Sequence, residues 1–94
     1  MNFTYYIITP ETTELAPMQR EELWDLDSMY SIIGCDMVEV VRLGEIDTAY
    51  ASSHELVVDE DGRRKHATKN PYATVLAGQV ILGTVILTPL NTID

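Results

Sequence analysis

The sequence of 94 residues predicts a small α+β domain, with a mainly antiparallel sheet that carries two helices on one face. Three observations predict this class: β-branched and aromatic runs at both ends, an amphipathic segment that ends at Gly34, and an Asn70-Pro71 pair that opens a second helix. The expected order of elements is β-α-β-β-α-β, as in a ferredoxin-like split β-α-β sheet.

The strands are predicted from runs of β-branched and aromatic residues. Residues 3–9 form the first strand, which Pro10 ends, and residues 10–17 read as a loop. Residues 37–43 form a second strand and residues 54–59 a third, with a start as early as Thr48. An acidic turn ends at Gly62, and residues 63–66 return as a short strand. Residues 80–88 are apolar on both faces, which favours a central last strand.

Two helices are predicted from periodicity and end signals. Leu23, Leu26, Tyr30 and Ile33 follow intervals of three and four residues, so they share one face of a helix over residues 21–33. Gly34 supplies the stop for this helix. In the second helix Asn70 is the N-cap and Pro71 the first helical residue, and the helix ends near Gly78.

The length and net charge of the chain restrict which domain organisation and which partners we expect. We expect residues 1–94 to form one domain, and a homo-oligomer, because so short a chain has a modest core. Fifteen acidic residues against six basic ones give a net charge of −9, which disfavours nucleic acid as a partner.

No apolar run approaches the roughly 20 residues of a membrane span. The first six residues lack the pattern of a secretion signal and Cys35 is the single cysteine, so we expect the cytoplasm.

Catalytic patterns are weak, and we expect no enzyme and no cofactor. His54 and His66 lie outside any recognisable Ser/His/Asp or Cys/His arrangement, and a lone Cys35 is typical of a small buried side chain. The acidic turn lacks the alternating ligands of a calcium loop, so we expect no metal there. The glycines are scattered singly, which excludes a glycine-rich phosphate loop.

Positive charge is concentrated beside the start of the predicted second helix. A helix N-terminus favours anions, and basic side chains beside it would add contacts to phosphate. The candidate ligand-binding residues are Arg63, Arg64, Lys65, His66, Lys69, Asn70 and Tyr72. The alternative is that this basic loop only neutralises Asp59, Glu60 and Asp61. The candidate residues for stacking on a base are Tyr5, Tyr6, Trp24, Tyr30, Tyr50 and Tyr72, most of which would also suit a core.

Several segments resemble the domain-of-unknown-function family 3846. Residues 33–41 resemble its helix-glycine-strand segment, residues 57–62 its acidic turn, residues 70–74 its Asn-Pro-x-Ala-Thr helix start and residues 80–85 its closing strand. The chain departs from the family at Asp59, where the family has Asn, and in its unusually basic loop before Asn70. The resemblance implies a phage, plasmid or other mobile-element protein, but no activity, because the family is uncharacterised.

Three functions remain open from the sequence. The first is a non-enzymatic phage protein that counters bacterial immunity by sequestering a small anionic, nucleotide-derived signal such as a cyclic nucleotide. The second is an acidic inhibitor that imitates nucleic acid and docks on a host defence protein such as a nuclease effector. The third is an enzyme that degrades a signal, for which Glu39, His54 or His66 would be the general base.

Overall fold

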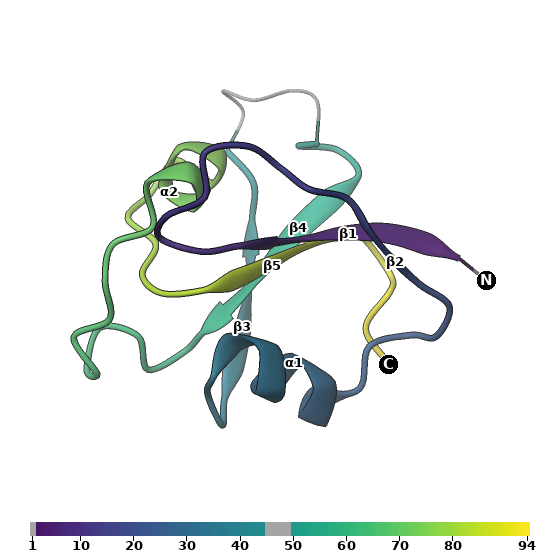
Figure 1. Cartoon of the computed structure of the whole chain (residues 1–94), viewed down its shortest axis with the longest axis horizontal. Coiled ribbons are helices and arrows are strands. Elements are labelled where there is room, and N and C mark those ends of the chain that lie inside the picture. The colour runs from purple at the N-terminus through teal and green to yellow at the C-terminus, as the bar shows by residue number, and fades with distance from the viewer. Residues whose placement is uncertain (1, 45–49) are drawn as a thin grey trace.

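The computed structural model describes residues 2–44 and 50–94 of the chain (Figure 1). The helices and strands, in chain order, are β1 (Phe3–Ile8), β2 (Met18–Arg20), α1 (Leu26–Ile33), β3 (Val38–Arg42), β4 (His54–Asp59), α2 (Pro71–Ala77) and β5 (Val85–Pro89). The possible early start of the third strand, at Thr48, lies outside the described residues. No helix among the described residues is long and apolar enough to cross a bilayer.

The five strands form one antiparallel sheet in the order β2-β1-β5-β4-β3. The α+β class, the order of the main elements and the antiparallel sheet are therefore confirmed. β5 is central, as expected, although it begins at Val85 and not at residue 80. In a split β-α-β sheet the first strand lies beside the third and parallel to it. Here β5 lies between β1 and β4, so the ferredoxin-like element order is kept with a different strand order.

The two helices lie on opposite faces of the sheet, which corrects the expectation that both cover one face (Figure 1). Alternate residues of a strand point to opposite faces. Leu56 and Val58 pack with the buried residues of α2, whereas Val57 between them packs with Met29 of α1. The sheet therefore has an apolar core on each side, and its central strands are buried on both.

The first helix is shorter than predicted, because the residues before it are extended. Trp24 donates its backbone N–H to the carbonyl of Thr92 (2.7 Å) and accepts from the N–H of Asp94 (2.8 Å). These bonds hold Trp24 against the C-terminal segment, so the helix begins at Leu26 and not at residue 21. Its predicted end is confirmed: Gly34 is left-handed at φ 78° and donates to the carbonyl of Tyr30.

The second helix follows its sequence signals. The Asn70 side chain caps it by accepting from the N–H of Ala73 (3.1 Å), Pro71 is its first residue, and Gly78 ends it in a left-handed conformation. Residues 63–66, predicted as a returning strand, instead continue the turn after β4. The backbone bonds that replace a strand ladder run from Lys65 N–H to Asp61 O and from Ala67 N–H to Gly62 O.

Candidate functional site

The predicted ligand loop is a tight turn with exposed cations. Arg63, Arg64, Lys65 and Lys69 are all exposed, and so is His66, whose φ of 56° lies in the left-handed region. A residue at positive φ is typical of a turn, which agrees with the backbone bonds that close this segment. The loop is therefore ordered by its own turns, and its basic side chains point outward.

Two of the four loop cations are paired with the acidic turn. Lys65 Nζ donates to Asp59 Oδ2 (3.0 Å) and Arg64 donates to Asp61 Oδ2 (3.1 Å). The side chain of Asp59 is only 9% exposed, and it also accepts from the N–H of Asp61 (2.8 Å). The hydrogen bond that Lys65 donates to the Asp59 carboxylate raises the pKa of Lys65. These contacts are the ones expected if the basic loop neutralises the acidic turn.

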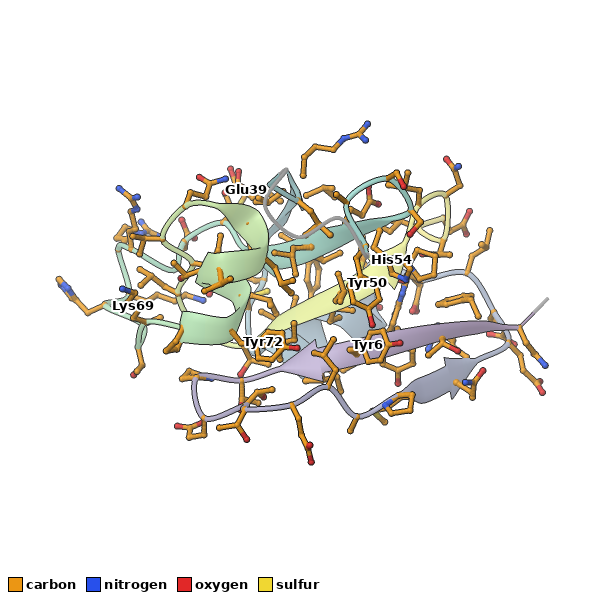
Figure 2. The ribbon with its side chains drawn as sticks, turned by 90° about the horizontal axis from the view of Figure 1, so that it is seen from above. Tyr6, Glu39, Tyr50, His54, Lys69 and Tyr72 are labelled. Atoms are coloured by element: carbon orange, nitrogen blue, oxygen red, sulfur yellow. The ribbon has the colours of Figure 1, made fainter. Side chains whose placement is uncertain are left out.

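Asn70 and Tyr72, the last two predicted site residues, are occupied by the fold. Asn70 is fully buried, and its Nδ2 donates to the carbonyls of Ile8 (2.9 Å) and Gly83 (2.8 Å) while its Oδ1 caps α2. Tyr72 packs against the core beneath α2. Figure 2 shows Tyr72 on the side of α2 that faces Tyr6, with Lys69 on the far side. The structure therefore does not bring these residues together with the loop cations.

Two hollows lie beside the loop, and three of the four loop cations line one or the other. A hollow of about 250 Å³ is lined by Arg63 together with three acidic residues, Glu39, Asp59 and Glu60. A second, wider hollow of about 490 Å³ lies between the end of α1 and the loop, and its charged lining residues are Asp36, Asp61, Arg64 and Lys65. Lys69 lines neither hollow. Neither hollow has an excess of positive charge.

Of the candidate stacking residues, Tyr30 is half-buried and lines the wider hollow, Tyr72 packs against the core beneath α2, and the other four form two groups. Tyr5 and Trp24 are buried and pack edge to face, with ring centroids 4.8 Å apart. Tyr6 and Tyr50 pack on the α2 side at 5.9 Å, and Tyr50 meets the His54 ring at 5.0 Å (Figure 2). Both groups pack as parts of the two cores, as the structural interpretation of these residues anticipated.

The pKa values of two candidate catalytic side chains, Cys35 and His54, are shifted by burial. Burial, followed by the charge of Asp59, raises the pKa of the Cys35 thiol, which disfavours the reactive thiolate. Burial lowers the pKa of His54, whose Nδ1 lies 2.7 Å from the Ser53 hydroxyl. Within residues 2–44 and 50–94, no group of three or more His, Cys, Asp or Glu side chains is placed to hold a metal ion.

A different surface stands out at the opposite edge of the sheet. Residues 18–27 cover β2, the turn after it and the start of α1, and we call them the 18–27 surface. Trp24 anchors this surface: it is fully buried, and its indole N–H donates to the Thr88 hydroxyl (3.0 Å). Thr88 in turn contacts Thr92 Oγ1 (2.9 Å), which donates to the carbonyl of Pro89. The surface is therefore fixed to the core by a buried, fully satisfied polar network.

Arg20 fixes the turn from its outer side. Its guanidinium lies over the Trp24 ring at 4.2 Å and donates from Nε to the carbonyl of Glu22 (2.9 Å). It also forms an ion pair of 3.5 Å with Asp25. The hydroxyl of Ser28 lowers the pKa of Asp25, so this carboxylate stays charged. The only basic residue of the 18–27 surface is thus held against the protein's own backbone.

The exposed part of the 18–27 surface is both acidic and apolar. Glu21, Glu22 and Asp27 are exposed and form no ion pair among the described residues. Leu23 is 40% exposed and Leu26 is 50% exposed, although their spacing predicted a buried helix face. Met29 is the buried residue of α1 instead. The predicted apolar stripe of α1 is therefore partly uncovered and is bordered by carboxylates.

The sequence pattern that marks this surface was interpreted as the buried face of a helix. Four acidic residues occur within seven positions, interrupted by the apolar Leu23, Trp24 and Leu26. The comparisons with known proteins add no relative: no protein-family model, no curated protein and no solved structure matches this chain.

Proposed function

We propose that this protein is a non-catalytic binder that docks through its 18–27 surface on a positively charged surface of another protein. The observation that carries the proposal is the combination of unpaired carboxylates with exposed leucines on a segment held rigidly by Trp24 and Arg20. Charge complementarity would steer the encounter, and the leucines would supply apolar burial. A rigid segment also loses little conformational entropy on binding.

A basic surface that normally holds nucleic acid is the partner chemistry that fits best. Such a surface is built to meet closely spaced negative charges, and the net charge of −9 would add long-range attraction. The resemblance to a mobile-element family suggests a bacterial defence nuclease as the partner, in the cytoplasm of the host. The protein would then act by occupying the nucleic-acid channel.

Charge-neutral variants test this function against a matched control. The test variant carries Glu21→Gln, Glu22→Gln and Asp27→Asn, and the control carries Glu11→Gln, Glu14→Gln and Glu60→Gln at other exposed sites. Each variant loses three negative charges, so the two have equal net charge. We expect a host protein that is retained by the wild type and the control, lost from the test variant, and released by duplex DNA. If no host protein shows this pattern, the proposal fails.

A second variant separates apolar burial from charge. Leu26→Ser removes an exposed side chain at the first position of α1, so the free energy of unfolding should change by less than about 0.5 kcal/mol. Full burial of a leucine contributes roughly 1.5 to 3 kcal/mol, and only half of Leu26 is exposed and free to be buried, so the affinity for the captured partner should fall by up to about tenfold. Titration calorimetry with the purified partner measures this loss. Unchanged affinity would exclude Leu26 from the interface.

Sequestration of a small anionic signal stays a prediction of the sequence. Arg63, which lines the smaller hollow, and Lys69 are the loop cations without an ion pair among the described residues. Calorimetry against cyclic and linear nucleotides tests it directly. Heat of binding that disappears in the variant Arg63→Ala with Lys69→Ala would favour this function over docking on a basic protein surface.

A further inference from the structure

The outermost strand β3 offers an open edge for pairing. β3 pairs with β4 over five consecutive positions, from Val38 opposite Asp59 to Arg42 opposite Glu55. The strand is last in the sheet order, and its outer side meets no other strand among the described residues. An open edge presents unpaired backbone N–H and C=O groups, which is a template for another strand.

The register shows which backbone groups face outward. In an antiparallel pair, directly opposite residues alternate between exchanging both hydrogen bonds and exchanging none. The N–H of Glu60 donates to the carbonyl of Met37 (3.1 Å), and these two residues are opposite each other in the β3–β4 register. Glu39 and Val41 therefore also bond toward β4. Val38, Val40 and Arg42 consequently point their backbone groups out of the sheet.

The edge of β3 has only part of the usual protection against pairing, namely the charged side chains of Glu39 and Arg42. Native edge strands are commonly blocked by proline, charged side chains and above all lysine, a β-bulge or shortness. β3 contains neither proline nor lysine, and its five-position register is continuous. The opposite edge strand, β2, has only three residues and follows Pro17 directly. Of the two edges, β3 alone is long enough and regular enough to accept a second strand.

We propose that β3 is the self-association surface of this protein, pairing antiparallel with β3 of a second copy. A two-fold axis perpendicular to the sheet leaves the α1 face of both copies on one side of the joined sheet and the α2 face on the other. Residues whose backbone groups point outward must then pair with residues of the same set in the second copy. Centring the axis on Val40 places Val40 opposite Val40 of the partner subunit and Val38 opposite the partner's Arg42. This register uses all three outward-facing residues of each chain.

The side chains of this register make one contact that favours pairing and one that opposes it. Val40 is 48% exposed and opposite the fully buried Val57 within the sheet, so two copies would cover each other's Val40. β-branched pairs are favourable across strands. Glu39 would face the partner's Glu39 diagonally on the other face, and each chain carries a net charge of −9. Association should therefore strengthen as salt screens this repulsion.

Pairing through β3 is compatible with the proposed function but does not depend on it. β3 and β2 are the two opposite edges of the sheet, so the 18–27 surface stays uncovered in such a dimer. Both copies would present it at the far ends of a sheet continuous across the two chains. A dimer of this form would bind a two-fold symmetric partner with increased apparent affinity.

Sedimentation and amide hydrogen exchange on the full chain test the inference together. The sedimenting mass should rise with protein concentration toward twice the chain mass, and more readily at higher salt. The amides of Val38, Val40 and Arg42 should become protected in parallel with the dimer fraction. Those of Glu39 and Val41 should be protected at every concentration. A chain that stays monomeric throughout, or a dimer in which the first three amides exchange equally fast at all concentrations, overturns the proposal.

Two substitutions at one position separate pairing from folding. Val40→Pro removes an outward N–H, which proline is tolerated to lack on an edge, whereas Val40→Thr keeps both the N–H and the branched shape. We expect loss of the dimer in Val40→Pro and retention in Val40→Thr, with unchanged circular dichroism in both. Dimerisation of a folded Val40→Pro protein would refute β3 pairing. If Val40→Pro does not fold, the exchange pattern of the wild type still decides.

Discussion

At the scale of single residues, the Asn70 side chain has three defined hydrogen-bond partners. It joins three separate parts of the chain: the end of β1 through Ile8, the turn before β5 through Gly83, and the start of α2 through Ala73. It does so while fully buried. An amide is the one side chain that donates two hydrogen bonds and accepts a third at this position without burying a charge.

Replacing Asn70 should therefore destabilise the fold severely. Asn70→Ala leaves the carbonyls of Ile8 and Gly83 and the N–H of Ala73 without their partner, so we expect a loss of about 2 to 4 kcal/mol in the free energy of unfolding. Urea denaturation measures the loss. The neighbouring exposed Lys69→Ala serves as the control and should change stability by less than about 0.5 kcal/mol. Equal effects of the two changes would contradict the role of Asn70.

Asn70 also shows what the sequence can and cannot reveal about a site. Its role as N-cap was predicted from the Asn-Pro pair, which is a local signal. Its bonds to Ile8 and Gly83 depend on how distant segments meet, so no local pattern reports them. Arg64 and Lys65 differ from Asn70 in this respect, because their partners Asp61 and Asp59 are near in sequence. The sequence left open whether these two cations neutralise the acidic turn or bind a ligand, and only the geometry of the turn distinguishes the two interpretations.

At the scale of elements, local signals were reliable and long-range pairing was not. β4 matches its predicted bounds, because its β-branched run is flanked by turn residues. β2 was missed because three residues without strand character become a strand only by pairing with β1. α1 was predicted five residues too early, since Leu23 fits a helical period, yet the neighbouring Trp24 is held extended by Thr92 and Asp94. Tertiary contacts overrode the local preference in both cases.

The end of α1 gives a prediction at this scale. Gly34 has φ 78°, and a Cβ added there would meet nothing within 4 Å, so only backbone strain opposes a side chain. Gly34→Ala should cost about 1 kcal/mol in the free energy of unfolding, and Gly34→Asn less, because asparagine tolerates the left-handed region better. Thermal denaturation of both variants checks the order. An alanine variant as stable as the asparagine variant would mean that the helix ends differently.

At the scale of the whole molecule, negative charge opposes the compact state. Fifteen acidic and six basic residues are held in one small domain, and three of the basic side chains are already engaged in ion pairs among the described residues. The resulting self-repulsion is spread over the surface and is screened by salt. The fold class followed from strand and helix patterns, whereas this distribution of charge required the structure.

Salt should therefore stabilise the folded chain. Raising the ionic strength from about 0.01 M to about 0.15 M shortens the screening length from roughly 30 Å to roughly 8 Å. We expect the free energy of unfolding to rise by about 1 kcal/mol, since the three ion pairs that salt weakens contribute little. Thermal melts in sodium chloride measure this, at a protein concentration where sedimentation shows only monomer. A melting temperature that falls with added salt would mean that attractive pairs dominate.

Trp24 is the single tryptophan of the chain, and its burial has a practical consequence. Its buried indole lies beneath the guanidinium of Arg20 within the 18–27 surface, so its fluorescence emission should be blue-shifted in the native state and red-shifted after denaturation. A ligand that moves Arg20 would alter the quantum yield without any label. One intrinsic fluorophore can thus follow both unfolding and partner engagement in the unmodified protein.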